Sequence, residues 1–481
     1  MKVAHLSDQL DDIQGMIGTG YGWLYSSWFW LLTIRDGREN DARQWLSKFV
    51  GRRFVVSAKA VQNSRTQRIE RAAAIAFSYS GITKLGYKQT DAHPFPSPFR
   101  GGMGSDLRAL LLRDRFREWR WSDVDGTDRV PVHVLIAEWA PRGAEPLVSD
   151  IDEKVFGIIK IDNDPCSFHQ ARGEKEERLR EAFGFRDGLA QPVIRGLKGE
   201  ESDGLKQGIG DAGPLYDDRV VAPGEFILGH RNEYGELTYC PNLEGWTGDA
   251  GHAAGRFGLN GSYLAVRQIE QDVEAFEKLR SAKNGKAYCE KLMGRRTTGL
   301  PLSWKGDPDA SVSDSKADAF RFRVDDANGF DCPKGAHIRR VNPRDSLGVD
   351  VKSSIKSTKL HRLLRRGRPY LEKTEGQAPR KGIFFIACNA DLERQFEFVH
   401  QRWVRNPNFG CLHDQDDPVV GSPAAQRRKF SIPGLPSGDE VSLEELTLTL
   451  GGGYFFLPGI KALEFIVEHG ARATRSDAAS A

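Results

Sequence analysis

Strand-like apolar runs, each followed by an amphipathic helix, occur in both halves of this 481-residue chain, and this pattern limits the fold most strongly. In the first half, "WFWLLTIRD" at residues 28–36 precedes "ENDARQWLSKFVG" at residues 39–51, where apolar side chains recur near helical spacing. In the second half, "GIFFIACNA" at residues 382–390 precedes residues 392–403, whose apolar side chains share one helical face. The pattern predicts a duplicated α+β fold, although no sequence identity between the halves is evident.

Other segments extend this prediction and suggest a domain boundary. The alternation of apolar residues at 130–136 is typical of a strand, and residues 307–326 resemble a polar loop. We also expect strands at residues 52–60 and 262–268, a helix at residues 269–276, and a last helix at residues 460–467 that follows "GGGYFFLP". Residues 196–218 are rich in Gly, Asp and Lys, so we expect a linker there between domains at residues 1–215 and 216–481.

Composition excludes several classes of protein. An apolar content of 39% indicates a folded globule, and a net charge of +3 from 69 basic and 66 acidic residues argues against an obligate nucleic-acid partner. The six cysteines are scattered without a CxxC pair, which fits a reducing compartment. No export signal is visible, and the apolar run from Tyr21 to Ile34 is too short to span a bilayer. We therefore expect a cytoplasmic protein with no membrane partner.

Common nucleotide, hydrolase and zinc motifs are absent or lack their context. "GIGDAG" at residues 208–213 matches GxGxxG, but it lies in the polar linker without a preceding strand. Cys332 lies five residues before His337, with no second pair of ligands to complete a zinc site. No GxxxxGK[ST], GxSxG or HExxH sequence occurs.

Three stretches remain that could carry chemistry. "FGFRDGLAQP" at residues 183–192 places the carboxylate Asp187 between two glycines and surrounds it with apolar residues. "CPKGAHIRRVNPRD" at residues 332–345 contains His337, and "HRLLRRGRPY" at residues 361–370 is rich in arginine. On spacing alone, a turn with an Asx-type hydrogen bond is the favoured interpretation of Asp187.

In this order the three stretches resemble the dye-decolorising (DyP-type) haem peroxidases, and "CNADLERQFEFVHQRW" and "GGGYFFLPG" extend the resemblance over most of the chain. "GFRDG" matches the GxxDG motif of that family, while Leu371 stands where the family usually has glycine. The resemblance implies two ferredoxin-like α+β domains with antiparallel sheets, arranged like a dimeric α+β barrel. It also implies one haem b per chain, held mainly by the C-terminal domain.

The activity that the resemblance implies is a peroxidase reaction. Hydrogen peroxide would oxidise the haem to an iron-oxo intermediate, and phenolic or dye-like donors would then be oxidised by one-electron steps. The alternative is a haem-binding or haem-delivery protein whose peroxidase activity is incidental. The sequence leaves the physiological donor and a homo-oligomeric state open.

By the same resemblance, the catalytic residues would be Asp187, which moves a proton between the two peroxide oxygens, and Arg365, whose cation stabilises developing negative charge. His337 would be the axial ligand of the haem iron. The other histidines that could compete for this role, His230, His361 and His400, lack matching family context.

Four further residues are candidates for contact with the haem. Gly184 and Gly188 would let the backbone approach the macrocycle closely. Phe384 and Phe385 come from one strand, so one of them should face the cavity and the other the sheet.

The remaining predictions concern charge and electron transfer. Arg344 would pair with a haem propionate, for which guanidinium geometry is suited. Asp391 is the candidate acceptor for the second N–H of the axial histidine, or else the N-cap of the following helix. Trp403 and Tyr370 are candidates for a relay to bulky donors, although the position of Trp403 is also ordinary core spacing.

Overall fold

The structure, a computed structural model, describes residues 5–63, 69–148, 150–163, 168–169, 178–197, 219–248, 255–310, 312–373, 376, 378–421, 428–434 and 440–468. The "GIGDAG" stretch and the expected domain boundary at residue 215 lie outside the described residues, as does most of the expected linker.

A mixed but mainly antiparallel sheet of 11 strands runs through the molecule. Its strands are β1 (Ser26–Ile34), β2 (Ala72–Phe77), β3 (Trp121–Ser122), β4 (Val130–Pro131), β5 (Val134–Ala140), β6 (Phe156–Asp162), β11 (Ser262–Gln271), β12 (Leu364–Arg365), β13 (Arg368–Glu372), β14 (Arg380–Asn389) and β17 (Thr447–Leu457). Three two-stranded sheets lie apart from it: β7 (Phe168–His169) with β8 (Arg178–Leu179), β9 (Val193–Ile194) with β10 (Val220–Val221), and β15 (Arg428–Ser431) with β16 (Glu440–Leu443).

The two halves of the chain repeat one strand order. The N-terminal strands lie in the order β2-β5-β1-β6, and the C-terminal strands in the order β12-β14-β11-β17, with β13 also on β14. Along the chain, the four strands of the N-terminal half are β1, β2, β5 and β6, and those of the C-terminal half are β11, β12 with β13, β14 and β17. In each half the second strand pairs with the third, the third with the first, and the first with the fourth. This is the connectivity expected of a β-α-β-β-α-β unit, so the predicted α+β class with ferredoxin-like halves is confirmed.

The two halves join at two places. Phe456 of β17 pairs with Phe77 of β2, which makes the sheet continuous. At the other end, an isolated bridge between Asn163 and Tyr370 brings the edge of β6 to β13. Among the described residues this contact is a single bridge, so the strands approach a barrel without closing one by continuous pairing.

Both faces of the sheet are buried. On β1, Trp28, Trp30 and Leu32 belong to one hydrophobic cluster, whereas Phe29 and Leu31 belong to another on the opposite face. This follows from the alternation of side chains along a strand, and it explains why residues 28–34 form a nearly continuous apolar run.

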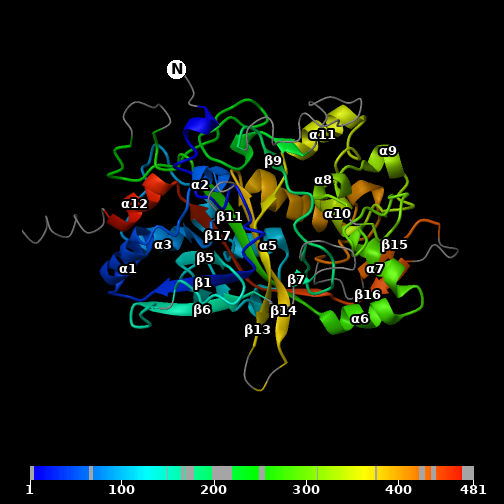
Figure 1. Cartoon of the computed structure of the whole chain (residues 1–481), viewed down its shortest axis with the longest axis horizontal. Helices are drawn as coiled ribbons and strands as arrows, with labels where there is room; N and C mark the ends of the chain where they lie inside the picture. The colour runs from blue at the N-terminus through cyan, green and yellow to red at the C-terminus, as the bar shows by residue number, and fades with distance from the viewer. Residues whose placement is uncertain are drawn as a thin grey trace, which may run out of the picture.

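Helices cover the sheet and surround the C-terminal half (Figure 1). The α-helices are α1 (Glu39–Gly51), α2 (Ala58–Asn63), α3 (Tyr79–Lys84), α4 (Ser97–Gly101), α5 (Asp106–Leu112), α6 (Val273–Ser281), α7 (Gly285–Met293), α8 (Asp314–Ala317), α9 (Phe322–Asp326), α10 (His337–Val341), α11 (Val351–Lys359) and α12 (Ile460–Glu468). Short 3₁₀ segments are η1 (Leu6–Asp8), η2 (Phe116–Glu118), η5 (Pro223–Glu225) and η8 (Phe409–Cys411), and the π-helical segments are η6 (Glu393–Glu397) and η7 (Val399–Val404). Among the described residues, no helix is long and apolar enough to cross a membrane.

In three segments the observed secondary structure differs from the one predicted from the sequence. Residues 52–60 were expected to form a strand, but they contribute only isolated bridges and the start of α2. The polar stretch at residues 307–326 contains α8 and α9. Residues 392–403 form π-helical turns, as shown by the hydrogen bond from the Glu397 N–H to the Leu392 carbonyl, 2.9 Å long.

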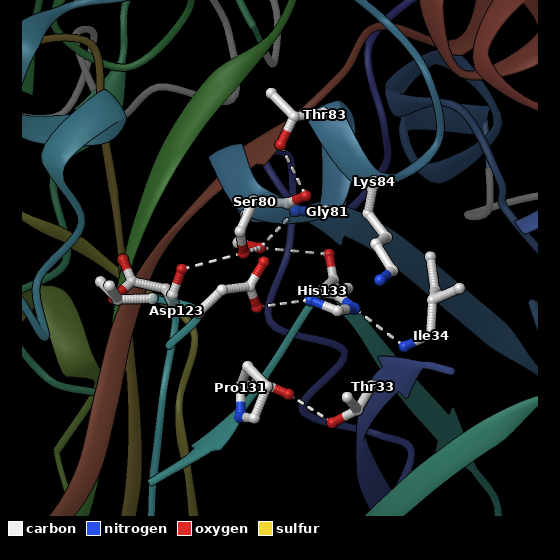
Figure 2. Close-up of polar contacts among 12 residues, drawn as sticks. Thr33, Ile34, Ser80, Gly81, Thr83, Lys84, Asp123, Pro131 and His133 are labelled. Atoms are coloured by element: carbon white, nitrogen blue, oxygen red, sulfur yellow. Dashed lines mark hydrogen bonds and ion pairs between the residues drawn. The ribbon is translucent and has the colours of Figure 1, made fainter. Parts of the chain in front are cut away.

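A polar cluster in the N-terminal half is structural and lies apart from the cavity described below (Figure 2). His133 accepts a hydrogen bond at Nδ1 from the Ile34 N–H, 2.9 Å away, and its Nε2 lies 2.8 Å from an Asp125 carboxylate oxygen. The Ser80 hydroxyl donates to the backbone carbonyl of Asp123 at 3.0 Å. Both ring nitrogens of His133 are thus engaged in holding loops together.

Candidate active site

A cavity of about 540 Å³ lies between the C-terminal sheet, the loop at residues 185–191, α10 and the π-helical segments. Alternate residues of β11 and β14 line its floor, in keeping with the two-residue period of a strand. The apolar lining comprises Phe185, Leu189, Ala190, Ile269, Met293, Phe320, Ile338, Val341, Leu363, Ile383, Phe385, Phe396, Val399, Val404, Val419, Val420 and Leu448.

His337, the predicted ligand, lies on the cavity wall at the first residue of α10. Its Nδ1 is 2.9 Å and 3.1 Å from the two carboxylate oxygens of Asp417, a fully buried residue. A carboxylate can only accept, so Nδ1 carries a proton, and in the neutral ring Nε2 then keeps its lone pair. Nε2 makes no hydrogen bond within the described part of the chain, which suits it to bind a metal.

The charge of Asp417 is stabilised locally. Burial tends to raise the pKa of this carboxyl, but the His337 ring, the Arg340 guanidinium and backbone N–H groups outweigh burial and lower the pKa below its usual value. The N–H groups of Val419 and Val420 each donate to Asp417 Oδ1 at 2.9 Å. His337 is therefore held by an ionised partner that is itself fixed.

Asp187 and Arg365, the predicted catalytic pair, line the same cavity. Arg365 Nη1 lies 3.7 Å from Asp187 Oδ1, and Arg365 Nη2 donates to the Leu189 carbonyl at 2.6 Å. Asp187 Oδ1 also accepts from the Gly188 N–H at 2.7 Å. Both side chains keep an exposed fraction, 22% for Asp187 and 38% for Arg365, so a small molecule in the cavity can reach them.

The neighbouring arginines are buried rather than forming an exposed basic loop. Arg366 donates to the carbonyls of Met16 and Ile17 at 2.6 and 2.7 Å. Arg368 donates to the carbonyls of Gly20 and Tyr21, both at 2.8 Å. These arginines fasten the N-terminal segment to the edge of the C-terminal sheet, where Gly20 lines the cavity.

Arg344 lies on the cavity wall within a buried cluster. Its guanidinium is ion-paired with Asp318, which also pairs with Arg295, and both guanidiniums stack on Phe320, at 4.1 Å for Arg344 and 5.1 Å for Arg295. Two guanidinium groups thus meet at one carboxylate beside the cavity. Guanidinium groups at this position are compatible with the predicted partner, a propionate.

The two glycines of the GxxDG stretch have different surroundings. Gly188 lines the cavity, has φ +81°, and leaves open space where a Cβ would stand. Gly184 has φ +90° but is not among the cavity-lining residues, and the atom nearest its missing Cβ is an Arg280 nitrogen at 3.9 Å. The turn itself requires glycine at residue 184, and the predicted approach of its backbone to the macrocycle stays a prediction.

The structure distinguishes the two phenylalanines of β14. Phe385 lines the cavity, whereas Phe384 lies on the opposite face and stacks on Phe29 with ring centroids 4.4 Å apart. The prediction of Phe384 as a cofactor contact is therefore wrong.

Asp391 is a helix cap rather than the partner of the histidine. Its carboxylate accepts from the Arg394 N–H at 3.0 Å, at the start of η6, and Asp417 occupies the position next to His337. The prediction that Asp391 accepts the second N–H of His337 is wrong. That N–H is taken by Asp417, which lies 80 residues after His337 in the sequence and is brought next to it by the fold.

Of the competing histidines, only His400 is among the residues that line the cavity. Its Nε2 lies 3.2 Å from the Leu112 carbonyl, and burial, with Arg267 and Arg405 nearby, lowers its pKa well below the usual value. His361 stacks on Phe398 with ring centroids 3.9 Å apart and points its Nδ1 at a backbone carbonyl.

Both candidate relay residues are buried. Trp403 is 6% exposed and packs on His361, Phe398 and Phe409, while Tyr370 is 0% exposed. The core interpretation of Trp403 is the one that the structure supports.

The cavity fits a flat, apolar cofactor with acidic groups. Its volume lies in the range of cofactor sites, its lining is largely apolar, and it presents one histidine whose Nε2 is available. Arg295, Arg344 and Arg365 supply cations for carboxylates. Among the described residues there is no group of three or more His, Cys, Asp or Glu that could hold a bare metal ion.

Several residues of the site carried no sequence signal. Asp417 stands in the acidic segment "HDQDDPVV", and no pattern there distinguishes it from the other two aspartates. Asp114 is ion-paired with both Arg267 and Arg405 beside the cavity, and the three residues come from distant parts of the chain. Only the fold brings these groups together.

Comparison with known proteins agrees with these observations. The family model for the C-terminal part of Dyp-type peroxidase matches residues 252–414. The dye-decolorizing peroxidase AauDyP1 of Auricularia auricula-judae is 29% identical over 499 residues, covering 96% of this chain and 87% of that protein. The multifunctional dye peroxidase DyP2 of Amycolatopsis sp. is 30% identical over 234 residues, covering 42% of this chain and 48% of the relative.

The fold is also shared with solved structures. A DyP-type peroxidase of Anabaena sp. superposes with a TM-score of 0.73 at 22% identity, covering 96% of this chain and 95% of the other. The structure of AauDyP complexed with imidazole gives a TM-score of 0.72 at 23% identity, covering 95% of this chain and 99% of that one.

Proposed function

Because the chain belongs to the DyP-type peroxidase family, we propose that it binds one haem b in this cavity and uses hydrogen peroxide to oxidise phenolic and dye-like donors. One observation carries the proposal: the His337–Asp417 pair and the Asp187–Arg365 pair line one cavity. A haem-delivery protein needs the first pair only.

Haem would supply an iron that binds peroxide and stores oxidising equivalents. His337 would hold it through Nε2, and Asp417 would keep the ring oriented by accepting the Nδ1 proton. Arg344 and Arg295 would face its propionates.

Asp187 and Arg365 would act on the peroxide. The Asp187 carboxylate would take a proton from the inner oxygen and deliver it to the outer one, which then leaves as water. The Arg365 guanidinium would stabilise the negative charge that develops on the oxygens during this transfer. Their separation of 3.7 Å leaves both groups able to contact one small substrate.

The test is to load the protein with haem, mix it with one equivalent of hydrogen peroxide, and follow the haem spectrum by stopped flow with and without a phenolic donor. A peroxidase is expected to show a rapid spectral change that the donor reverses. Stable haem binding without that change would support the haem-delivery alternative.

Asp417→Asn should show whether the charge behind His337 matters. The variant keeps the shape but removes the anion, so we expect a more positive haem reduction potential and a reaction with peroxide slower by about 10- to 100-fold. Asp391→Asn is the matched control, because that carboxylate caps η6 and does not contact His337. A potential that shifts with Asp391→Asn but not with Asp417→Asn would contradict this assignment.

Trp403→Phe and Tyr370→Phe are expected to cause no selective loss with bulky donors, because both side chains are buried and offer a dye little or no surface. The measurement compares turnover of a bulky anthraquinone dye with that of a small phenol in each variant. A loss confined to the bulky dye would restore these residues as a relay.

A further inference from the structure

Glu181 is a buried glutamate that lines the cavity beside the loop at residues 185–191, which carries Asp187. Residues 180–186 form a small hairpin, in which Arg180 and Arg186 are a bridge pair and the Glu181 N–H donates to the Phe185 carbonyl at 3.1 Å. The Glu181 carbonyl accepts from the Gly184 N–H at 2.8 Å. Asp187 is the residue that directly follows this hairpin.

The Glu181 side chain folds into its own hairpin. Its Oε2 accepts from the Phe183 N–H at 2.9 Å, and its Oε1 accepts from the Phe185 N–H at 2.7 Å. Gln271, on β11, donates its side-chain amide to the same Oε2. Both carboxylate oxygens are thus used, and the hairpin is tied to the floor of the cavity.

We infer that Glu181 is a positioning residue for peroxide cleavage, which fixes the loop that carries Asp187. The loop is then held from both sides, by Glu181 before the aspartate and by Arg365, through the Leu189 carbonyl, after it. A proton transfer between two bound oxygens depends on a carboxylate placed to a fraction of an ångström, so a loosened loop should slow the reaction. This inference rests on the proposed function.

The chemistry explains why a carboxylate is needed there. Phe183 and Phe185 bring two N–H donors to two different oxygens. A glutamine offers one oxygen and would turn its own N–H₂ group toward one of these donors. Burial raises the pKa of Glu181 to about 7, and the nearby Asp187 carboxylate contributes to this rise. Ionisation of the buried carboxyl group therefore costs free energy in the folded protein.

Glu138 provides a matched control. It is a buried glutamate in the N-terminal half whose two oxygens accept from the N–H groups of Leu147 and Val148 at 2.7 and 2.9 Å, and burial raises its pKa to about 7 as well. It does not line the cavity. Glu138→Gln should therefore match Glu181→Gln in its effect on folding and differ in its effect on chemistry.

The experiment measures the second-order rate of the haem-loaded protein with hydrogen peroxide, and with cyanide, which also gives up a proton as it binds. We expect Glu181→Gln to slow both rates by tens-fold, up to about 10²-fold, with an unchanged KM for the phenolic donor. Glu138→Gln should leave both rates unchanged. In an Asp187→Asn background, Glu181→Gln should add no further slowing, because it acts through Asp187.

Two results would overturn the inference. One is a wild-type rate in Glu181→Gln with both ligands. The other is an equal further slowing in the Asp187→Asn background, which would mean that Glu181 acts independently of the aspartate. A wild-type protein that binds haem and does not react with peroxide would instead remove the proposed function itself.

Discussion

Replacing His337 with alanine is expected to remove most of the haem from the purified protein and to change the spectrum of any that remains. His337 is the cavity histidine whose Nε2 makes no hydrogen bond among the described residues, and Asp417 holds its Nδ1. The remaining contacts to a macrocycle would be apolar or would involve its propionates, and these do not replace a bond to iron. The measurement is the haem-to-protein ratio after gel filtration, together with the ferric absorption spectrum.

His361→Ala and His400→Ala serve as controls. His361 is not among the cavity-lining residues, so its loss should leave haem content unchanged. His400 lines the cavity but directs Nε2 to a backbone carbonyl, so it too should retain haem with an unaltered axial ligand. Full occupancy and an unchanged spectrum in His337→Ala, with loss in His400→Ala, would transfer the ligand role to His400.

Much of the fold could be predicted from periodicity because its elements bury apolar residues regularly. The strand at residues 28–36, the helix at residues 39–51 and the strand at residues 382–390 appear as β1, α1 and β14 with small shifts at their ends. The strand predicted at residues 52–60 is wrong, because a short apolar run does not distinguish a full strand from isolated bridges that precede a helix. The pairing of β17 with β2, far apart in the chain, has no local signal at all.

The site was predictable only where a motif brings its residues close in sequence. Asp187 and His337 each stand in a distinctive stretch of sequence. Asp417 contacts His337 but lies 80 residues away in the sequence, and no short sequence pattern indicates that contact. Alternation along β14 indicated that one of two phenylalanines faces the cavity, but the phase of the strand depends on its neighbours. The burial of Arg366 could not be predicted, because a sequence does not show which backbone carbonyls will accept hydrogen bonds from a buried guanidinium.

Asp187→Asn and Arg365→Leu are expected to slow the reaction with hydrogen peroxide, at least one of them by about 10²-fold or more, while haem stays bound. Asparagine keeps the shape of Asp187 but cannot accept the proton. Leucine removes the cation and also the hydrogen bond to the Leu189 carbonyl that anchors the loop, so we expect the larger effect from Arg365→Leu. Stopped-flow spectra at varied peroxide concentration measure both rates.

Arg365→Lys separates the two contributions of the arginine. If charge dominates, lysine should restore much of the rate, because an ammonium can still stabilise an oxygen anion. If anchoring dominates, lysine should remain slow, because it lacks the planar fork that reaches the Leu189 carbonyl and the Asp187 carboxylate together. The double variant Asp187→Asn/Arg365→Leu decides the whole assignment: a wild-type rate with peroxide in that protein, at full haem occupancy, would mean that neither residue takes part in cleavage and that the proton moves by another route.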